Sequence, residues 1–435
     1  MIRFAYSALL KWKNSPKRKP LILYGARQTG KTWLLKEFGK SEYKSVLYLN
    51  FDVNRKLHQF FADDISPKTI IAGLESYFNE KISPADTLLI FDEIQECQRA
   101  KDSLKYFCED PVHYNIASAG SFLGIAEGKF PVGKIEKITL YPLSFYEFLC
   151  ALGQDQLVNT LHGRNNRHLK SIHGLLSDKL KEYFYVGGMP EAVKTYADKN
   201  DLQVVREVQE NILDSYKSDF SRHIKGVDIP KVRMLWDSLP VHLSKEKKKF
   251  IYKEIKTGGR ASEFENAMDW LVQTGLVYKI SKTNEPKLPL SSYAEREILK
   301  LYMLDVGLLS AKSTLDIKTF YESNHEVFKE FKGAITEQYI AQELKILGSL
   351  PIFYWGSATG KAELDFIFQY GNDIVPVEVK SDLNKKSLSL NVYREKYRPK
   401  QAIRTSLNHF GIDQGLYSIP LYMIESLKEI LDGAN

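Results

Sequence analysis

Short apolar runs alternate with helix-like segments over the first 150 residues of the chain. Each run is bounded by polar or turn-forming residues, which is typical of buried strands. The runs occupy residues 21–24, 45–51, 87–91 and 114–118. Between the second and third runs, residues 67–81 carry apolar side chains at helical spacing. Strands that alternate with helices in this way predict βαβ units and a parallel sheet.

The pattern changes after residue 150. Residues 150–225 have mostly helical spacing, which the sequence Gly187-Gly188-Met189-Pro190 interrupts with either a plain turn or a loop that borders a nucleotide. Residues 226–290 follow the order helix, glycine turn, helix, strand, which is the order of a winged helix-turn-helix. Its second helix carries Glu263, Glu265 and Asp269, whose charges repel phosphates. A structural or protein-contact role is therefore favoured over direct DNA reading.

Length and composition limit the number of domains and the class of protein. The 435 residues suffice for about three domains, and 43% hydrophobic with 26% charged residues is ordinary for a soluble globular protein. No apolar run approaches the ~18 residues of a membrane span, and no cleavage site follows the apolar patch at residues 4–10. The three cysteines are odd in number and lack C-x-x-C spacing. We therefore expect reduced thiols, a cytoplasmic location and no membrane partner.

One segment carries a phosphate-binding motif. The sequence Gly25-Ala26-Arg27-Gln28-Thr29-Gly30-Lys31-Thr32 fits G-x-x-x-x-G-K-[ST], the phosphate-binding loop of nucleotide hydrolases. It follows an expected strand and opens an expected helix, as the chemistry requires. The binding residues are then Gly25, Arg27, Gln28, Thr29, Gly30, Lys31 and Thr32. We expect backbone N–H groups to wrap the phosphates, Lys31 to reach the β- and γ-phosphates and act in catalysis, and Thr32 to bind Mg²⁺.

Two acids end the strand at residues 87–91. Asp92 is expected to hold Mg²⁺ through contacts with the ion and its bound waters. Glu93 is expected to be the general base that activates the attacking water. At the end of the next strand, Ser118 and Ser121 are both candidates to sense the γ-phosphate. In a parallel sheet these strand ends share one edge with the phosphate loop. Three residues are candidate donors of the catalytic arginine, unless a neighbouring subunit supplies it: Arg27, Arg99 and Arg222.

A second constellation lies near the C-terminus. An amphipathic segment at 332–347 contains Glu337, and two later strands carry Asp365 and the sequence Glu378-Val379-Lys380. Residues i and i+2 of a strand face the same side, so Glu378 and Lys380 are expected to point together toward Asp365. This is the PD-(D/E)XK nuclease pattern. Glu337, Asp365 and Glu378 are predicted metal ligands, and Asp365, Glu378 and Lys380 predicted catalytic residues. A surface hairpin with outward charges is the competing interpretation.

The segment from Lys380 to Arg404 carries much of the net charge. It contains eight Lys or Arg and two acids, a difference of +6 in a chain total of +7. Tyr393 and Tyr397 lie among the basic residues. Basic residues with interleaved aromatics suit a nucleic-acid backbone, although a solvated helix face has the same composition.

The motifs together resemble the bacterial and archaeal AAA-type P-loop ATPases that carry an uncharacterised, nuclease-like C-terminal domain. The resemblance covers nearly the whole chain and implies ATP rather than GTP. It rests on residues 23–32, 91–95, 119–124, 130–134, 140–149, 187–191 and 302–309, and on the motifs near 365 and 378. It implies four parts: an AAA-type ATPase core at 1–150, a helical extension at 151–225, a winged-helix-like linker at 226–315 and a PD-(D/E)XK nuclease-like domain at 316–435. The expected fold class is therefore α/β: a P-loop NTPase parallel sheet, a helical winged-helix-like middle region and a restriction-endonuclease-like α/β domain.

Two functions follow as hypotheses. The first is a Mg²⁺-dependent protein that binds and hydrolyses ATP and acts on DNA or RNA through its nuclease-like domain. The second is a regulatory or signalling ATPase whose C-terminal domain is catalytically inactive and binds a protein partner. Salt-sensitive binding to DNA would favour the first, whereas ATP-dependent assembly of the chain into homo-oligomers without such binding would favour the second.

Overall fold

The computed structural model describes residues 1–120, 131, 133–223, 229–244, 249–255, 259–316, 326–348, 350–381 and 387–433. Ser121, Lys385 and Lys386 lie outside these residues, as does the side chain of Arg222. The chain falls into two compact units. One comprises residues 2–141 with 273–275, and the other comprises Met1, 142–272 and 276–435. None of the helices within the described ranges combines the length and apolar character that crossing a bilayer needs.

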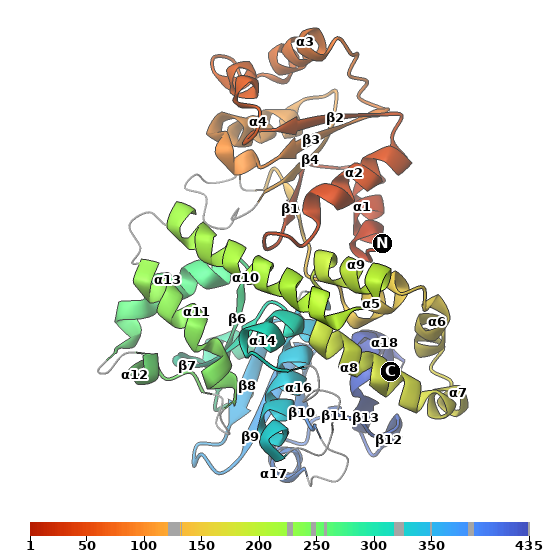
Figure 1. Ribbon diagram of the computed structural model, residues 1–435, viewed down its shortest axis with the longest axis vertical. Helices are drawn as coiled ribbons and strands as arrows, with labels where there is room; N and C mark the ends of the chain where they lie inside the picture. The colour runs from red at the N-terminus through yellow and green to blue at the C-terminus, as the bar shows by residue number, and fades with distance from the viewer. Residues whose placement is uncertain are drawn as a thin grey trace. The chain divides into compact units, whose positions relative to one another are not determined.

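The unit at residues 2–141 is built on the predicted parallel sheet (Figure 1). Its five strands lie in the order β2-β3-β4-β1-β5, and every neighbouring pair is parallel. The strands are β1 (Leu21–Tyr24), β2 (Ser45–Asn50), β3 (Thr87–Asp92), β4 (Asn115–Ala119) and β5 (Glu136–Thr139). Four of them confirm the apolar runs. The fifth was not predicted, because its sequence Glu-Lys-Ile-Thr is polar and alternates between half-buried and exposed positions.

Helices cover both faces of this sheet, as buried parallel strands require. Helices α1 (Ala5–Lys13) and α2 (Lys31–Glu42) pack through Leu9, Leu34 and Phe38 against one face. Helices α3 (Pro67–Phe78) and α4 (Gln98–Glu109), with the short helix Arg55–Phe61, cover the other. Each face therefore has its own apolar core, and the polar residues at the strand ends remain available for a site.

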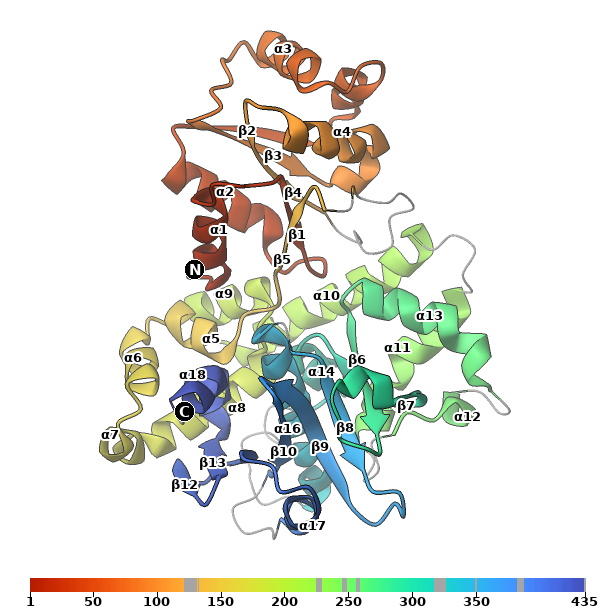
Figure 2. The same ribbon diagram turned by 180° about the vertical axis from the view of Figure 1, so that it is seen from behind.

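The other unit begins with a run of helices and continues into a mixed sheet (Figures 1 and 2). The helices of the first part are α5 (Phe145–Ala151), α6 (Asp155–Gly163), α7 (Asn166–Ser171), α8 (His173–Val186), α9 (Pro190–Lys199) and α10 (Leu202–His223). The middle region has the winged-helix order, with three helices followed by a hairpin. These elements are α11 (Ile229–Ser244), α12 (Tyr252–Ile255), α13 (Ala261–Gln273), β6 (Val277–Thr283) and β7 (Ala294–Met303).

The sheet of this unit joins the middle region to the C-terminal part. Its eight strands lie in the order β12-β13-β11-β10-β9-β8-β6-β7, so the hairpin of the winged-helix-like region extends the C-terminal sheet. The C-terminal strands are β8 (Ile352–Gly356), β9 (Glu363–Tyr370), β10 (Asp373–Val379), β11 (Ala402–Ser406), β12 (Gly411–Asp413) and β13 (Leu416–Pro420). The C-terminal helices are α14 (Val306–Lys312), α16 (Glu326–Ile346), α17 (Leu388–Tyr397) and α18 (Leu427–Asp432). Both α16 and α17 pack on β10, and α17 contributes Leu390 and Tyr393 to a core with Trp355. The predicted α/β fold class is confirmed in both sheets.

A close junction links three distant segments of this unit. The backbone N–H of Gly188 donates to the Asp305 carboxylate at 2.6 Å, and the N–H of Leu143 donates to the carbonyl of Gly188 at 2.6 Å. Asp305 also caps α14 by accepting from the N–H of Leu308. The Gly187–Pro190 turn is therefore fixed by hydrogen bonds to residues before α5 and at the start of α14.

Candidate nucleotide site and C-terminal carboxylate cluster

The phosphate-binding motif forms the turn between β1 and α2. Gly25 has φ +144° and Gly30 has φ +90°, conformations that side chains rarely adopt. A Cβ on Gly25 would lie 2.2 Å from the carbonyl oxygen of Leu140. The turn leads into the first residues of α2, whose N–H groups have no partner within the helix and attract anions. The backbone thus has the shape that a phosphate cradle needs.

Lys31 lies inside this turn and is largely buried. Its Nζ donates to the carbonyls of Gly25 at 2.9 Å and Ala26 at 2.7 Å. Burial lowers the pKa of Lys31 to about 8, although the carboxylates of Glu93 and Asp92 oppose that shift. The ammonium therefore lies within the cradle and close to both acids of the neighbouring strand.

Asp92 faces α2 from the carboxyl end of β3. One carboxylate oxygen, Oδ2, accepts hydrogen bonds from Thr32 Oγ1 at 2.9 Å and from Tyr48 Oη at 2.6 Å. Asn50 Nδ2 in turn donates to Tyr48 Oη at 3.1 Å. The structure therefore brings together Thr32 and Asp92, the two residues expected to hold Mg²⁺, and adds a tyrosine that orients the carboxylate.

Glu93 follows the strand in a left-handed conformation, with φ +49°. Gln95 Nε2 donates to Glu93 Oε2 at 2.5 Å, which orients the carboxylate. On β4, Ser118 is fully buried and its hydroxyl has no hydrogen-bond partner among the described residues. An unsatisfied buried hydroxyl fits a group that meets a ligand. Ser121, the other candidate sensor, lies outside the described residues.

Sequence reasoning missed two residues of this unit. Tyr48 is one, and Arg3 is the other: its Nη1 donates to the carbonyl of Thr29 at 2.9 Å and its Nη2 to the carbonyl of Tyr141 at 2.6 Å. Arg3 thereby braces the phosphate loop from the N-terminal segment. Neither belongs to a motif, and the partners lie 26 or more residues away, so no local signal identifies them.

The predicted arginine donors differ in their surroundings. Arg99 uses its guanidinium on the carbonyls of Phe61 and Asp63, which fixes the helix Arg55–Phe61 to α4. Arg27 lies in the loop, near enough to Lys31 that its charge adds to the larger effect of burial in lowering the pKa of that lysine. The loop position of Arg27 is the more suitable of the two for meeting a phosphate.

The residues at the phosphate loop and the neighbouring strand ends fit a nucleoside triphosphate and a magnesium ion. The glycine turn, the buried lysine, the Thr32–Asp92 pair and the unsatisfied Ser118 hydroxyl supply the donors and acceptors that phosphate and a hard cation need. Gln28 Oε1 is a further buried oxygen in the loop without a hydrogen-bond partner among the described residues.

In the unit at 142–435, Asp365 and the Glu378–Lys380 pair lie on neighbouring antiparallel strands. Lys380 Nζ is 3.0 Å from Glu378 Oε1, and the N–H of Val379 donates to Asp365 Oδ2 at 2.8 Å. Glu378 is buried, and its second oxygen has no hydrogen-bond partner among the described residues. These three predicted residues are therefore close together, as the alternation of the strands led us to expect.

A β-bulge shapes this part of β9. Phe353 pairs with Ile367 and Trp355 pairs with Leu364, so Tyr354 alone lies opposite two residues, Asp365 and Phe366. Bulges of this kind re-aim side chains and often lie beside functional sites. The sequence of this strand does not predict the bulge.

The third predicted metal ligand, Glu337, has other partners. Its Oε1 accepts from Lys300 Nζ at 3.2 Å and from the Tyr302 hydroxyl. Lys300 Nζ also lies 3.0 Å from Glu363 Oε1 and 4.8 Å from the centre of the Tyr354 ring. Burial alone would lower the pKa of Lys300, but the carboxylates of Glu337, Glu363 and Asp365 outweigh it and raise that pKa. A buried lysine therefore forms ion pairs within the carboxylate cluster.

The donor set for a metal at this cluster is incomplete. Among the residues that the structure describes, no group of three or more His, Cys, Asp or Glu side chains is arranged to hold a metal ion. Asp365 and Glu378 remain suitable in type and place, whereas Glu337 pairs with an ammonium and a hydroxyl. The residues therefore do not fit the three-carboxylate metal site that the sequence predicts.

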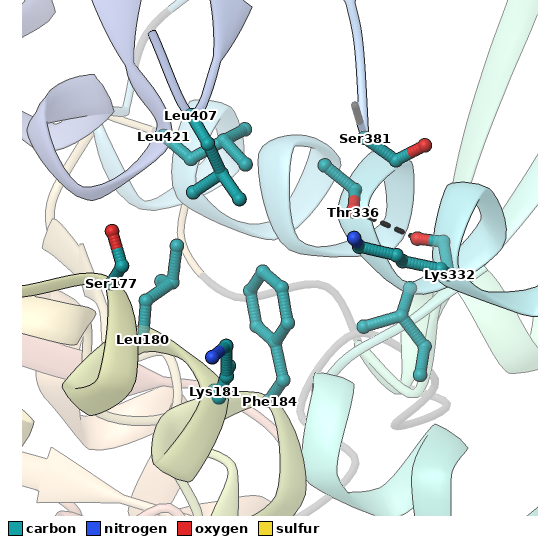
Figure 3. A pocket seen from close by; sticks show the side chains of 10 residues that line it. Ser177, Leu180, Lys181, Phe184, Lys332, Thr336, Ser381, Leu407 and Leu421 are labelled. Atoms are coloured by element: carbon teal, nitrogen blue, oxygen red, sulfur yellow. Dashed lines mark hydrogen bonds between the residues drawn. The ribbon is translucent and has the colours of Figure 1, made fainter. Parts of the chain in front are cut away.

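A small apolar cavity of about 70 Å³ has Thr336 and Ser381 in its wall, which are sequence neighbours of Glu337 and Lys380, but no carboxylate lines it (Figure 3). Leu180 and Phe184 of α8 face Leu407 and Leu421 across it, and Ser381 follows β10 at its edge. Thr336 Oγ1 donates to the carbonyl of Lys332 within α16. The polar side chains in its wall are serine, threonine and lysine, so the cavity supplies no carboxylate, imidazole or thiolate ligand for a metal.

The basic segment forms part of α17 and the turn after it. Lys396, Arg398 and Lys400 are exposed, and Arg394 is half-buried with Nη2 donating to the carbonyl of Gln414 at 2.8 Å. Asn391, Arg394, Glu395, Arg398 and Pro399 line an open hollow of about 340 Å³. Tyr393 and Tyr397 belong to the aromatic core around Trp355, so they are not available to stack on bases.

Comparisons with known proteins match three regions of the chain. Residues 17–149 match the family described as an AAA domain. Residues 177–319 and 332–424 match families described as Domain of unknown function (DUF8612) and Domain of unknown function (DUF4143). An uncharacterized protein of Methanocaldococcus jannaschii, MJ1637, is 23% identical over 298 residues. The match covers 64% of this chain and 61% of that relative, which is less than two-thirds of its length.

Two solved structures are similar in part. The Walker-type ATPase PABY2304 of Pyrococcus abyssi aligns with a TM-score of 0.42 and 14% identity, over 72% of this chain and 95% of that one. The ORC1 protein of Aeropyrum pernix, solved in complex with DNA, aligns with a TM-score of 0.31 and 11% identity, over 72% of this chain and 93% of that one. Residues 17–149 are therefore similar to AAA domains, and their parallel sheet is built around a phosphate loop of the P-loop type.

Proposed function

We propose that the ATPase domain hydrolyses ATP with Mg²⁺ at the edge of the sheet formed by the phosphate loop, Asp92 and Glu93. The observation that carries this proposal is the Thr32–Asp92 hydrogen bond at 2.9 Å, which joins the loop to the acid of the neighbouring strand. These two residues would hold the metal, which when bound neutralises charge on the phosphate oxygens. The pairing links the phosphate cradle to the strand that ends in Glu93.

The residues of the chain have distinct roles in this proposal. Lys31 exchanges its contacts with the carbonyls of Gly25 and Ala26 for the phosphates. Glu93, oriented by Gln95, accepts the proton of the attacking water. Tyr48 holds the Asp92 carboxylate in place, and Ser118 supplies a buried hydroxyl to the terminal phosphate.

The first prediction concerns Lys31. Lys31→Ala is expected to weaken ATP binding about 100-fold, because charge-assisted hydrogen bonds to phosphate contribute about 1.5–3 kcal/mol each. Isothermal titration of the full chain with ATP and Mg²⁺ measures the loss. Lys40→Ala is the matched control, since Lys40 is an exposed lysine on the same helix and should bind ATP as the unchanged chain does. Equal affinities of the two variants would contradict the assignment of the loop.

For the C-terminal region we propose binding to a nucleic-acid backbone rather than cleavage. The exposed charges of Lys396, Arg398 and Lys400 support contact with a polyanion. The partners of Glu337 disfavour cleavage that relies on three carboxylates and a metal. The competing function is that of a regulatory ATPase whose C-terminal region binds a protein partner.

A salt titration distinguishes these two functions. The full chain is expected to bind a fluorescent single-stranded DNA or RNA oligonucleotide with an affinity that falls as salt rises. The double variant Lys396→Gln/Arg398→Gln should reduce the slope of log K against log salt by about 0.7 for each phosphate contact removed. Lys68→Gln changes an exposed lysine on α3 and should leave the slope unchanged. Binding that is insensitive to salt and to the double variant would reject the nucleic-acid role.

A further inference from the structure

Lys300 occupies the centre of the C-terminal carboxylate cluster, although it comes from the winged-helix-like region. It lies on β7, and only 2% of its side chain is exposed. Its ammonium lies 3.2 Å from Glu337 Oε1 on α16 and 3.0 Å from Glu363 Oε1 on β9. One cation therefore bridges a helix and a strand that are both needed for the predicted metal site.

Lys300 bridges the carboxylates of Glu337 and Glu363, as a metal ion bound at this place would. Buried carboxylates must be neutralised, and a divalent cation or a lysine can serve. Glu337 Oε1 already receives two donors, Lys300 and Tyr302, and the aromatic face of Tyr354 lies 4.8 Å from the same ammonium. A metal bound to that oxygen would have to displace a buried charge from its partners, which is unfavourable because that charge is then left unpaired.

The charges around the cluster support the same conclusion. Glu337 and Glu363 contact Lys300, and Glu378 contacts Lys380. Lys249 adds a further ammonium 3.9 Å from the other oxygen of Glu363. These three glutamates thus all lie within ion-pair distance of a lysine, so the cluster has little charge left for divalent ions.

We propose that Lys300 is a built-in substitute for a divalent cation, so that Glu337 is a partner of Lys300 and not a metal ligand. The C-terminal cluster is then held together without metal on the side of α16. At most one cation binds, at Asp365 and Glu378, where the second oxygen of Glu378 lacks a hydrogen-bond partner among the described residues. This inference is independent of the ATPase proposal, since all of its residues lie in the other unit.

The test is a titration of the nucleotide-free full chain with Mn²⁺, followed by electron paramagnetic resonance. An Asp92→Asn background removes the carboxylate proposed to hold a metal in the ATPase domain. Lys300→Met in this background is expected to bind one additional Mn²⁺ per chain, because Glu337 and Glu363 then need a new cation. Lys300→Arg keeps the positive charge and should bind no more Mn²⁺ than the background. Lys300→Met that folds but gains no Mn²⁺ would overturn the proposal.

A second comparison keeps the proposal testable if Lys300→Met fails to fold. Glu337→Gln with Lys300 unchanged is expected to bind Mn²⁺ as the background does, whereas Glu378→Gln is expected to lose any Mn²⁺ bound at this place. Mn²⁺ binding that falls about tenfold or more in Glu337→Gln would show that Glu337 is a metal ligand after all. Thermal unfolding of each variant with and without Mn²⁺ checks that the compared proteins are folded, because a bound ion raises the melting temperature.

Discussion

Glu93→Gln is expected to lower the rate of ATP hydrolysis by about 10²–10⁴-fold while leaving ATP affinity unchanged. Glutamine has the same shape as glutamate but cannot accept the proton of the attacking water, and positioned bases contribute about that factor. Glu93 lies one residue beyond Asp92, and Gln95 orients its carboxylate through a 2.5 Å hydrogen bond. The amide oxygen of the introduced glutamine can accept the same bond, so the local structure should persist. Phosphate release at saturating ATP measures turnover, and titration with ATP measures binding.

Glu96→Gln is the matched control for this change. Glu96 lies in the short helix Ile94–Glu96 that follows Glu93, and it is exposed, so its loss of charge should leave turnover within about twofold of the unchanged chain. Glu93→Gln with full activity would refute the assignment of the base. Loss of both binding and turnover would instead indicate that Glu93 helps to shape the phosphate loop.

The core of the ATPase domain could be predicted from the sequence, because the apolar runs and the phosphate motif are local sequence patterns. Strands β1, β3 and β4 are apolar runs buried on both faces, and the phosphate motif fixes what lies between β1 and α2. The polar strand β5 has no such signal and is held by pairing with β1. Arg3 and Tyr48 were missed for the same reason, since their roles arise from contacts across the fold and not from spacing along the chain.

The C-terminal cluster was predicted in part. The i, i+2 relation placed Glu378 and Lys380 on one side of β10, and they are paired at 3.0 Å. Lys300 could not be predicted, because β7 belongs to a hairpin that sequence assigned to a separate linker. Only the pairing of β6 with β8, at Lys282 with Tyr354, shows that both regions share one sheet. The contact of Lys300 with Glu337 thus depends on a sheet that joins the two regions, which the sequence does not reveal.

Two acids that contact the start of α5, the half-buried Glu425 and the buried Glu343, show the same limit of sequence-based prediction. Glu425 accepts from Ser144 Oγ at 2.7 Å and from the N–H of Tyr146 at 3.0 Å, and Glu343 accepts from the N–H of Phe145. Burial raises the pKa of Glu425 to about 8. Ser144 and Glu425 lie 281 residues apart, so a sequence pattern cannot connect them. These bonds fix the segment that follows the ATPase domain to the C-terminal region.

Gly188→Ala is expected to destabilise the unit at 142–435 by about 3 kcal/mol or more, because the site has no room for a methyl group. A Cβ on Gly188 would lie 2.0 Å from the carbonyl oxygen of Leu143 and 2.8 Å from the nitrogen of Leu143. Both atoms belong to the backbone, so no side-chain rotation relieves the overlap. Separating the segments would also weaken the Leu143–Gly188 hydrogen bond of 2.6 Å and the contact of Gly188 with Asp305. Urea unfolding followed by tryptophan fluorescence gives the shift in midpoint.

Gly174→Ala is the control, because Gly174 lies within α8 and a Cβ there would meet nothing within 4 Å. Alanine in a helix is favoured over glycine by about 1 kcal/mol, so this variant should unfold at an equal or higher urea concentration than the unchanged chain. The two substitutions add the same methyl group, and they differ in whether backbone surrounds it. Opposite shifts of the urea midpoint would therefore show that the destabilisation arises at the junction of Leu143, Gly188 and Asp305. Equal shifts would show that these three segments do not approach each other as closely as the structure has them.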